Sequence, residues 1–195
     1  MNSRGRFDTK AVYALLVLAG IIGLVFYWRV GVENVPGDYN VKKGNYRLED
    51  GLYEQALSEF TRALEKNPEH VQAHLGLAIT YMQMERPDDD RAEFEKTIAL
   101  APDLAAAYAN LGILYDRAGK YQLALANYRK SLSLDPEILE GPGWLWRFMH
   151  NVEERPPTIA DRIAYLETEL KKPPEERVLQ VRELDRQQRM YKVDD

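Results

Sequence analysis

The sequence has no cysteine, only three histidines and no long basic run, and each of these absences excludes a class of function. Without cysteine the chain has no disulfide, no thiolate metal ligand and no cysteine nucleophile. Its 26 basic side chains are outnumbered by 31 acidic ones, which gives a net charge of -5. A protein of this charge balance does not attract phosphates, so we expect no nucleic-acid partner.

Motifs for catalysis are also missing. His70 and His74 have the i, i+4 spacing of a helical zinc pair, but no third ligand stands near them. Residues 87–90, PDDD, lack the alternating ligands of a calcium loop. No nucleophile with its base, glycine-rich phosphate loop or carboxylate pair stands out. We therefore predict a protein that is not an enzyme and that holds no metal, no cofactor and no small-molecule substrate.

One long apolar run is present near the N-terminus. Residues 11–28, AVYALLVLAGIIGLVFYW, carry no charge, and as a helix they would extend ~27 Å, close to the ~30 Å of a bilayer core. Tyr13 at one end, and Tyr27 and Trp28 at the other, fit the two interfacial belts. No cleavage site follows the run. We expect an uncleaved transmembrane anchor over 11–32.

The charges around this run predict its orientation. Residues 1–10 contain three basic side chains and one acidic side chain, whereas the basic residue after the run is offset by acidic ones. This bias favours a short cytoplasmic N-terminus, 1–10, and places the rest of the chain on the periplasmic side of the inner membrane. Ala19, Gly20 and Gly23 would let another transmembrane helix pack closely, although such spacings also arise by chance.

The remainder of the chain contains a repeat. Pro68, Pro102 and Pro136 stand 34 residues apart, and each closes a segment of similar lettering. The third segment shows the pattern most fully, with Tyr108, Leu111, Gly112, Tyr115, Ala124, Tyr128 and Pro136 at its marked positions. This spacing resembles that of the tetratricopeptide repeat (TPR) family, whose 34-residue unit is a pair of helices. The resemblance covers about residues 37–136.

The small residues of this pattern have a physical explanation. Gly112 and Ala124 lack bulk where two helices cross closely, and Tyr128 fills the space beyond the crossing. Gly119 supplies the positive φ that ends the first helix. A single repeat does not bury its own apolar face, so three repeats are near the minimum for a stable stack. We predict an all-α solenoid over 33–136, with repeats at about 37–70, 71–104 and 105–138.

Two repeats depart from the family pattern. In the second, Asp90 occupies the position of the small contact residue, so we expect Pro87 to begin the next helix and an aspartate to cap it. In the first repeat, Asn40, Lys43 and Arg47 replace an aromatic residue, a leucine and a tyrosine. The first helix of that repeat is therefore the least regular of the predicted elements.

The resemblance implies a concave protein-binding groove that is lined by the first helix of each repeat. The corresponding residues are Val41, Asn45, Leu48, Leu75, Ile79, Met82, Ala109, Ile113 and Arg117. This mostly apolar stripe suits an amphipathic helix or an apolar peptide, or else the chain's own C-terminal segment fills it. TPR domains that capture chaperone carboxylate tails use lysine, asparagine and arginine in the groove. Here Asn45 matches one such position, whereas Val41, Gly76, Ala106 and Asn110 do not, so we do not expect that subtype.

The C-terminal third contains two further segments. Residues 137–155 include Trp144, Trp146 and Phe148, which either cover the open end of the solenoid or anchor a partner. Residues 156–195 begin with a predicted helix, in which Thr158 and Asp161 offer a capping box. A stripe on this helix, formed by Ile159, Ile163, Leu166 and Leu170, requires a surface to pack against. Over 156–195 we therefore predict a C-terminal helix followed by a partner-binding tail.

These features together predict a protein-protein interaction scaffold that acts as an accessory or assembly subunit of a membrane-bound protein complex. Its partners would be protein subunits of that complex. Two alternatives use the same anchor and repeats. One is a membrane-tethered chaperone-like TPR protein that handles secreted or cytochrome clients, and the other is an organelle import receptor whose repeats face the cytosol.

Overall fold

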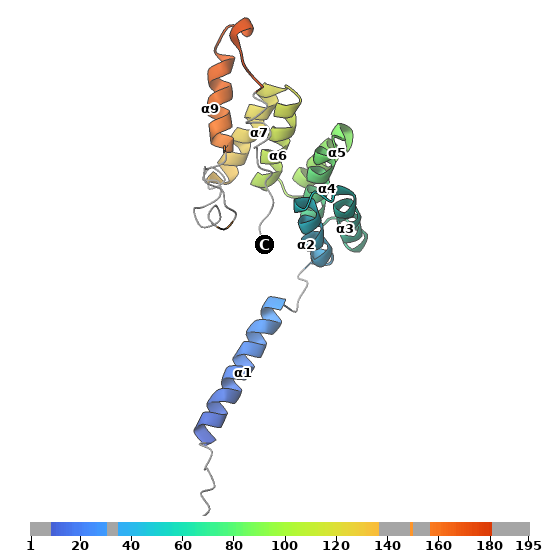
Figure 1. Cartoon of the computed structure of the whole chain (residues 1–195), viewed down its shortest axis with the longest axis vertical. Coiled ribbons are helices and arrows are strands. Elements are labelled where there is room, and N and C mark those ends of the chain that lie inside the picture. The colour runs from blue at the N-terminus through green and yellow to red at the C-terminus, as the bar shows by residue number, and fades with distance from the viewer. Residues whose placement is uncertain (1–8, 31–34, 137–148, 150–156, 181–195) are drawn as a thin grey trace, which may run out of the picture.

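A computed structural model of the chain describes residues 9–30, 35–136, 149 and 157–180 (Figure 1). The described residues form eight α-helices and one short 3-10 helix, and no strand occurs among them. The helices are α1 (Thr9–Val30), α2 (Asp38–Glu49), α3 (Tyr53–Lys66), α4 (Val71–Gln83), α5 (Pro87–Leu100), α6 (Ala105–Arg117), α7 (Tyr121–Leu134), α9 (Ile159–Leu170) and the 3-10 helix η2 (Pro174–Glu176). The predicted all-α class is confirmed.

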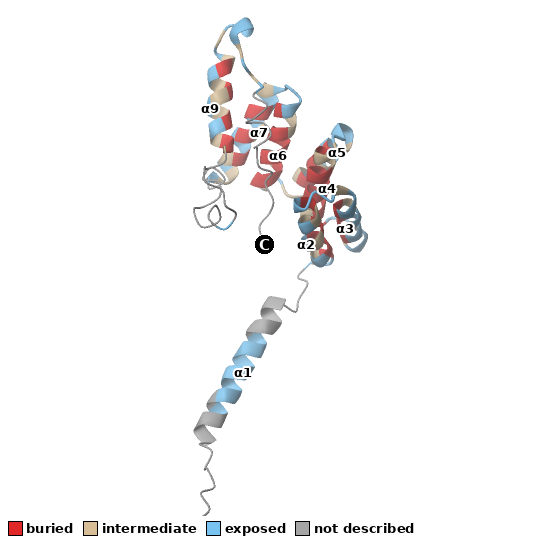
Figure 2. Cartoon of the chain, in the orientation of Figure 1, coloured by how far each residue is buried: buried red, intermediate tan, exposed pale blue. Residues whose placement is uncertain are grey.

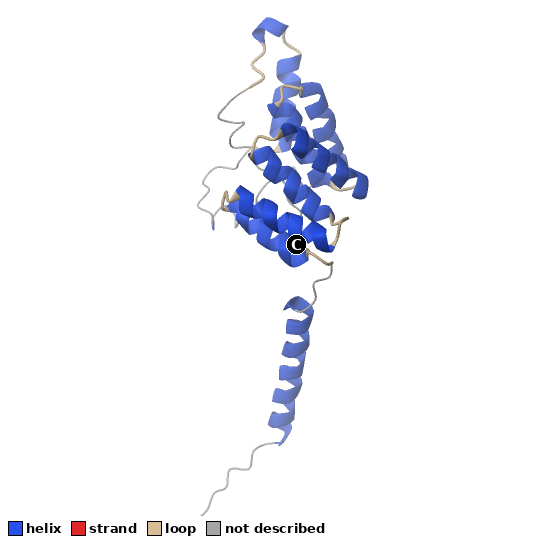
Figure 3. Ribbon diagram, turned by 90° about the vertical axis from the view of Figure 1, so that its right-hand side faces the viewer, coloured by secondary structure: helices blue, strands red, loops and turns tan. Residues whose placement is uncertain are grey.

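Helices α2 to α7 form three pairs that stack along one direction (Figures 1 and 3). The pairs are α2 with α3, α4 with α5 and α6 with α7, and each pair packs on the next through α3 with α4 and α5 with α6. One buried apolar cluster runs through all three pairs, as the buried inner faces in Figure 2 show. Helix α9 then packs on α7 and extends the stack beyond the repeats.

Glycine lets the helices of this stack cross closely. A Cβ atom on Gly112 would lie 2.4 Å from Cδ1 of Tyr128, which is completely buried. The Phe60 ring packs against two glycines, one on α2 and one on α4. A Cβ on Gly44 would lie 2.7 Å from the ring, and a Cβ on Gly76 would lie 2.4 Å from it. The predicted close crossing at Gly112 is confirmed, and Phe60 joins the first repeat to the second.

The turns inside the second and third repeats differ in one respect. Gly119 follows α6 with a φ of 72°, as predicted, and its N–H donates to the carbonyl of Asp116 at 2.9 Å. Glu85 takes the equivalent position 34 residues earlier with a φ of 55°, a conformation that favours glycine. Pro87 is the first residue of α5, as predicted.

The predicted aspartate cap of α5 is wrong. Arg86 holds the cap position, and no side chain caps the helix there. The three aspartates instead fall within the first turn, where their charge favours the positive end of the helix dipole. Asp89 accepts a hydrogen bond from Nε of Arg86 at 2.8 Å. Asp90 is 1% exposed, at the position where the repeat pattern calls for a small residue, and burial raises the pKa of its carboxyl.

Helix α1 covers the long apolar run and stands apart from the repeat array (Figure 1). Its described side chains, those of Tyr13 and of residues 15–24, are all exposed. Among the residues that the structure describes, no helix combines the length and the apolar content that crossing a membrane demands. The predicted transmembrane anchor therefore has no support from the described residues.

Candidate protein-binding surface

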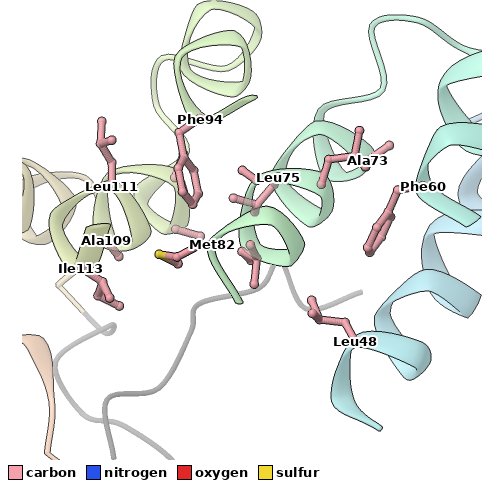
Figure 4. Close-up of a cluster of buried hydrophobic side chains, with 14 of the residues drawn as sticks. Leu48, Phe60, Ala73, Leu75, Met82, Phe94, Ala109, Leu111 and Ile113 are labelled. Carbon is pink, nitrogen blue, oxygen red and sulfur yellow. The ribbon is translucent and has the colours of Figure 1, made fainter. Parts of the chain in front are cut away.

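The predicted groove stripe lies largely inside the array. Asn45 is half-buried and Arg117 is exposed, whereas the apolar members of the stripe are buried. Those buried members are Val41, Leu48, Leu75, Ile79, Met82, Ala109 and Ile113, with exposed fractions between 0% and 8%. Figure 4 shows several of them gathered in one cluster between the helices. The stripe is thus part of the core of this structure, and its role in binding a partner stays a prediction.

A polar network occupies the first repeat where the family pattern calls for apolar residues. Glu59 on α3 is 5% exposed, and its carboxylate accepts hydrogen bonds from Nδ2 of Asn40 at 2.9 Å and from Nζ of Lys43 at 2.7 Å. Arg62 donates to the same carboxylate at 2.9 Å. The hydrogen bond from Lys43 is the main cause that lowers the pKa of Glu59 below its ordinary value of 4.5. This network explains how α2 forms and docks despite its irregular sequence.

The two histidines that the sequence places one helical turn apart have different partners. Nδ1 of His74 lies 2.6 Å from Oε2 of Glu93 on α5, and its Nε2 lies 3.0 Å from the carbonyl oxygen of Pro68. Both ring nitrogens therefore face acceptors. The bond to Glu93 is the main cause that raises the pKa of His74 above its ordinary value of 6.5. His70 instead lies 2.9 Å from the carboxylate of Asp38 on α2, so the two imidazoles tie α4 to different neighbours.

A buried ion pair holds α9 on the last repeat. Arg162 donates from Nε to Oδ2 of Asp116 at 2.6 Å and from Nη2 to Oδ1 at 2.7 Å. Tyr128 donates its hydroxyl to the same carboxylate at 3.1 Å. The side chains of Asp116 and Arg162 are 3% and 8% exposed, so this bidentate pair is shielded from water. The sequence pattern gave no sign of it, because 46 residues separate the two partners.

The described part of the C-terminal segment returns along α9. Arg162 donates to the carbonyl of Leu179 at 2.9 Å, and Tyr165 donates to the carbonyl of Val178 at 2.6 Å. Glu169 accepts from the N–H of Val178 at 2.9 Å and from Lys172 at 2.6 Å, and these bonds lower its pKa, the Lys172 contribution being the larger. Residues 177–180 are therefore bound to the helix that precedes them rather than extended away from it.

The capping box of α9 is confirmed. Oδ2 of Asp161 accepts from the N–H of Thr158 at 2.8 Å, and the Thr158 hydroxyl accepts from the Asp161 N–H at 3.4 Å. Of the predicted stripe, Ile159 and Leu166 are buried in the core cluster, and Ile163 and Leu170 pack against it. The stripe thus packs on the array's own end, which is the surface it required.

Several predicted site residues receive no account from the structure. Trp144, Trp146 and Phe148 lie outside the described residues, as does most of the segment 137–155 and all of 181–195. On α1, Ala19, Gly20 and Gly23 are exposed, and a Cβ on either glycine would meet no atom within 4 Å. The helix-packing role of these small residues stays a prediction.

Comparisons with known proteins agree with this architecture. Family models described as tetratricopeptide repeat match residues 47–112 and 105–138. Among solved structures, the first TPR of Spaghetti (RPAP3), bound to the HSP90 peptide SRMEEVD, is similar with a TM-score of 0.57 at 17% identity, over 73% of this chain and 99% of that one. The crystal structure of MamA is similar with a TM-score of 0.49 at 20% identity, over 62% of this chain and 71% of that one. No curated protein matches the chain.

Proposed function

We propose that this chain, which is a tetratricopeptide repeat protein, is tethered to a membrane by α1 and acts as an accessory or assembly subunit of a membrane-bound protein complex. TPR proteins serve as protein-protein interaction scaffolds, and the stacked helix pairs provide such a scaffold here. Under this proposal the function is positional. The tether concentrates the array near membrane partners, so contacts of modest strength suffice.

The exposure of α1 carries the membrane part of the proposal. Leu15 and Leu24 are 66% and 63% exposed and Ile22 is 60% exposed, although the core of the array is complete without α1. Burial of one such side chain is favourable by about 1.5–3 kcal/mol, so a helix with apolar side chains on all its described faces gains greatly from leaving water. Residues 11–28 carry no charged side chain, so the sequence is also uncharged at those positions of this range whose side chains the structure does not describe.

The proposal divides the chain as the sequence suggests. Residues 11–32 would form the anchor in the inner membrane, after a cytoplasmic segment at 1–10, and the array would lie on the periplasmic side. Ala19, Gly20 and Gly23 would mark the face where a transmembrane helix of a partner packs. Trp144, Trp146 and Phe148 would anchor a soluble region of the partner or cover the end of the array.

The groove stripe has two candidate occupants, a partner peptide and the chain's own C-terminal segment. Ile79 and Ile113, at 2% and 0% exposure, lie in the core between the helices of the array, so their burial does not distinguish the two. Residues 177–180 return along α9, with Leu179 packed against the core, which keeps the C-terminal segment beside the array. If that segment fills the stripe, a partner must displace it.

The similar Spaghetti domain is bound to an HSP90 peptide, but its likeness is one of fold. Capture of a carboxylate tail requires charged or amide donors at groove positions. Here Val41 and Gly76 offer none, and Ala106 and Asn110 are buried, at 7% and 0% exposure. We therefore propose a partner other than a chaperone carboxylate tail.

Co-purification from native membranes tests this function. Membranes would be solubilised in mild detergent, and the proteins recovered with the chain would be identified and their ratios measured. A fixed stoichiometric partner supports a structural or assembly subunit. Heterogeneous substoichiometric clients would point instead to the chaperone-like alternative, and digestion of the array by protease added to the cytosolic side would point to the import receptor.

The tether has a separate test in the full-length chain. Leu18→Arg with Ile22→Arg places two charges on α1, whereas Leu18→Ala with Ile22→Ala is the matched control. We expect the chain with arginines to be lost from membranes washed at high pH and the alanine control to remain. Equal retention of both variants would contradict a membrane-embedded α1.

A further inference from the structure

The three repeats give equivalent residues at intervals of 34 positions, and this equivalence identifies the face with which each pair meets the pair before it. On α4 the face consists of Ala73, Gly76 and Thr80, spaced i, i+3, i+7. It packs on α3, because a Cβ on Gly76 would lie 2.4 Å from the ring of Phe60. Ala73 and Thr80 are 0% exposed. We call this surface the stacking face.

Subtraction of 34 residues places the stacking face of α2 at Tyr39, Lys42 and Tyr46. All three side chains are exposed, Tyr39 at 67% and Tyr46 at 59%. The array begins with α2, so no preceding repeat covers this face within the described residues. Two tyrosines thus lie on the surface at the N-terminal end of the solenoid, at the positions where α4 buries an alanine and a threonine.

The side chains on this face exclude a partner that docks as another TPR unit does. Gly76 lets the Phe60 ring approach the backbone of α4, whereas Lys42 occupies that position on α2. A helix that meets α2 must therefore pack over bulky side chains at ordinary helix separation. Tyrosine suits such a contact, because it gives a large apolar surface with one polar end and loses little conformational entropy.

We propose that the stacking face of α2 binds the same face of a second copy of this chain, with the two α2 helices antiparallel about a two-fold axis near Tyr46. The charges on the face are self-complementary in that arrangement. Lys42 and Glu49 lie seven residues apart and are both exposed. Antiparallel pairing around Tyr46 brings Lys42 of each copy to Glu49 of the other, so the pair forms twice.

Other occupants fit less well. A second copy does not reach this face with its far end, because α9 packs on α7 there and Arg162 fixes it through Asp116. An anionic lipid surface would meet three acidic side chains, Glu49, Asp50 and Glu54, as well as three basic ones, Lys42, Lys43 and Arg47, so this end of the array has no excess of positive charge to attract it. The isologous contact is the arrangement that matches both the exposed tyrosines and the mixed charge. This inference does not depend on the membrane tether.

The absence of cysteine makes the contact directly testable. Tyr46→Cys would place one thiol in each full-length chain, close to the two-fold axis, and Leu123→Cys, on α7 at 48% exposure, is the matched control. Mild oxidation of the purified chain in detergent should cross-link Tyr46→Cys into a covalent dimer and leave Leu123→Cys monomeric. Failure of Tyr46→Cys to cross-link faster than the control would overturn the proposal.

A second experiment separates this contact from association through α1. The mass of the full-length chain would be measured by light scattering as a function of concentration. Tyr39→Ser with Tyr46→Ser should weaken the dimer about tenfold or more, and Leu123→Ser should not. Lys42→Glu and Glu49→Lys should each weaken it, and the two together should restore it. A monomeric wild-type chain, a dimer insensitive to the serine variants, or binding of the face to anionic vesicles instead would each overturn the proposal.

Discussion

Gly112 and Tyr128 lie on the two helices of the third repeat, and the tyrosine ring fills the space that a side chain at 112 would need. A Cβ there would lie 2.4 Å from Cδ1 and 2.6 Å from Cε1 of the ring. The ring does not move aside easily, because Tyr128 is completely buried and its hydroxyl donates to Asp116. The second repeat is joined to the first by the same relationship, with Phe60 against Gly76.

Gly76→Ala should therefore destabilise the array by about 1–3 kcal/mol, the usual cost of overpacking a core. The free energy of unfolding would be measured by urea denaturation of the full-length chain in mild detergent. Gly20→Ala, which meets no atom within 4 Å on α1, should leave it unchanged. A smaller side chain in place of the Phe60 ring should make room for the added methyl group. Phe60→Leu combined with Gly76→Ala should therefore lower the free energy of unfolding by less than the sum of the two single changes. Strict additivity would show that the contact is not the cause.

Removal of the Arg162 guanidinium should detach α9. Arg162→Met leaves the Asp116 carboxylate buried without its main partner, and breaking a buried pair in this way costs about 3–5 kcal/mol. Arg129→Met is the matched control, because Arg129 pairs with Glu167 at 2.6 Å with a side chain that is 60% exposed, and such surface pairs contribute about 0–1 kcal/mol. Urea denaturation of both variants would check this difference. Similar losses would mean that Asp116 tolerates exposure to water.

The His74 contacts should make stability depend on pH near neutrality. The pKa of His74 is raised in the folded chain above its ordinary value of 6.5, mainly by Glu93, so the folded state favours the protonated ring. The stabilisation is then fully present below pH 6.5 and is lost as pH rises through the folded pKa. Melting temperatures across this range should fall for the wild type more than for His74→Gln. A parallel decline in both would assign the effect to another group.

The Glu59 network should have the opposite pH dependence. The folded pKa of Glu59 lies below its ordinary value of 4.5, mainly because Lys43 donates to it, so its contribution is present above pH 4.5 and is lost as pH falls through the folded pKa. Glu59→Gln should remove this acid sensitivity, whereas Glu65→Gln, at an exposed position of the same helix, should retain it. Acid titrations followed by circular dichroism would measure the difference. An unchanged acid transition in Glu59→Gln would contradict the assignment.

The sequence predicted the parts of the fold that depend on local backbone geometry and on the repeat. The 34-residue spacing of Pro68, Pro102 and Pro136 predicted the helix pairs, Gly119 predicted the positive φ after α6, and Thr158 predicted the capping box of α9. These features need only their own neighbours in the chain, or the equivalent position one repeat away. The predicted aspartate cap of α5 was wrong because the cap falls at Arg86 and the first aspartate, Asp88, stands two residues after it.

Contacts between distant segments were beyond the reach of the sequence pattern. Asn40 and Lys43 were identified only as departures from the family pattern, and nothing in their spacing indicated that Glu59 would compensate for both. The pairing of Asp116 with Arg162 had no signal at all, since charged residues at helix ends are usually solvated. The residues of the groove stripe lie on α2, α4 and α6, the first helix of each repeat, but the burial of the apolar ones depends on the whole assembly, and their role as a groove stays a prediction.

The separation between Asp116 and Arg162 has a consequence for how the protein is made. Asp116 is synthesised 46 residues before the arginine that neutralises its buried carboxylate. At about 5–20 residues per second, that delay is roughly 2 to 9 s. During this interval the nascent chain exposes the C-terminal end of its array with an unmatched charge, so the final repeat completes its packing only when α9 emerges.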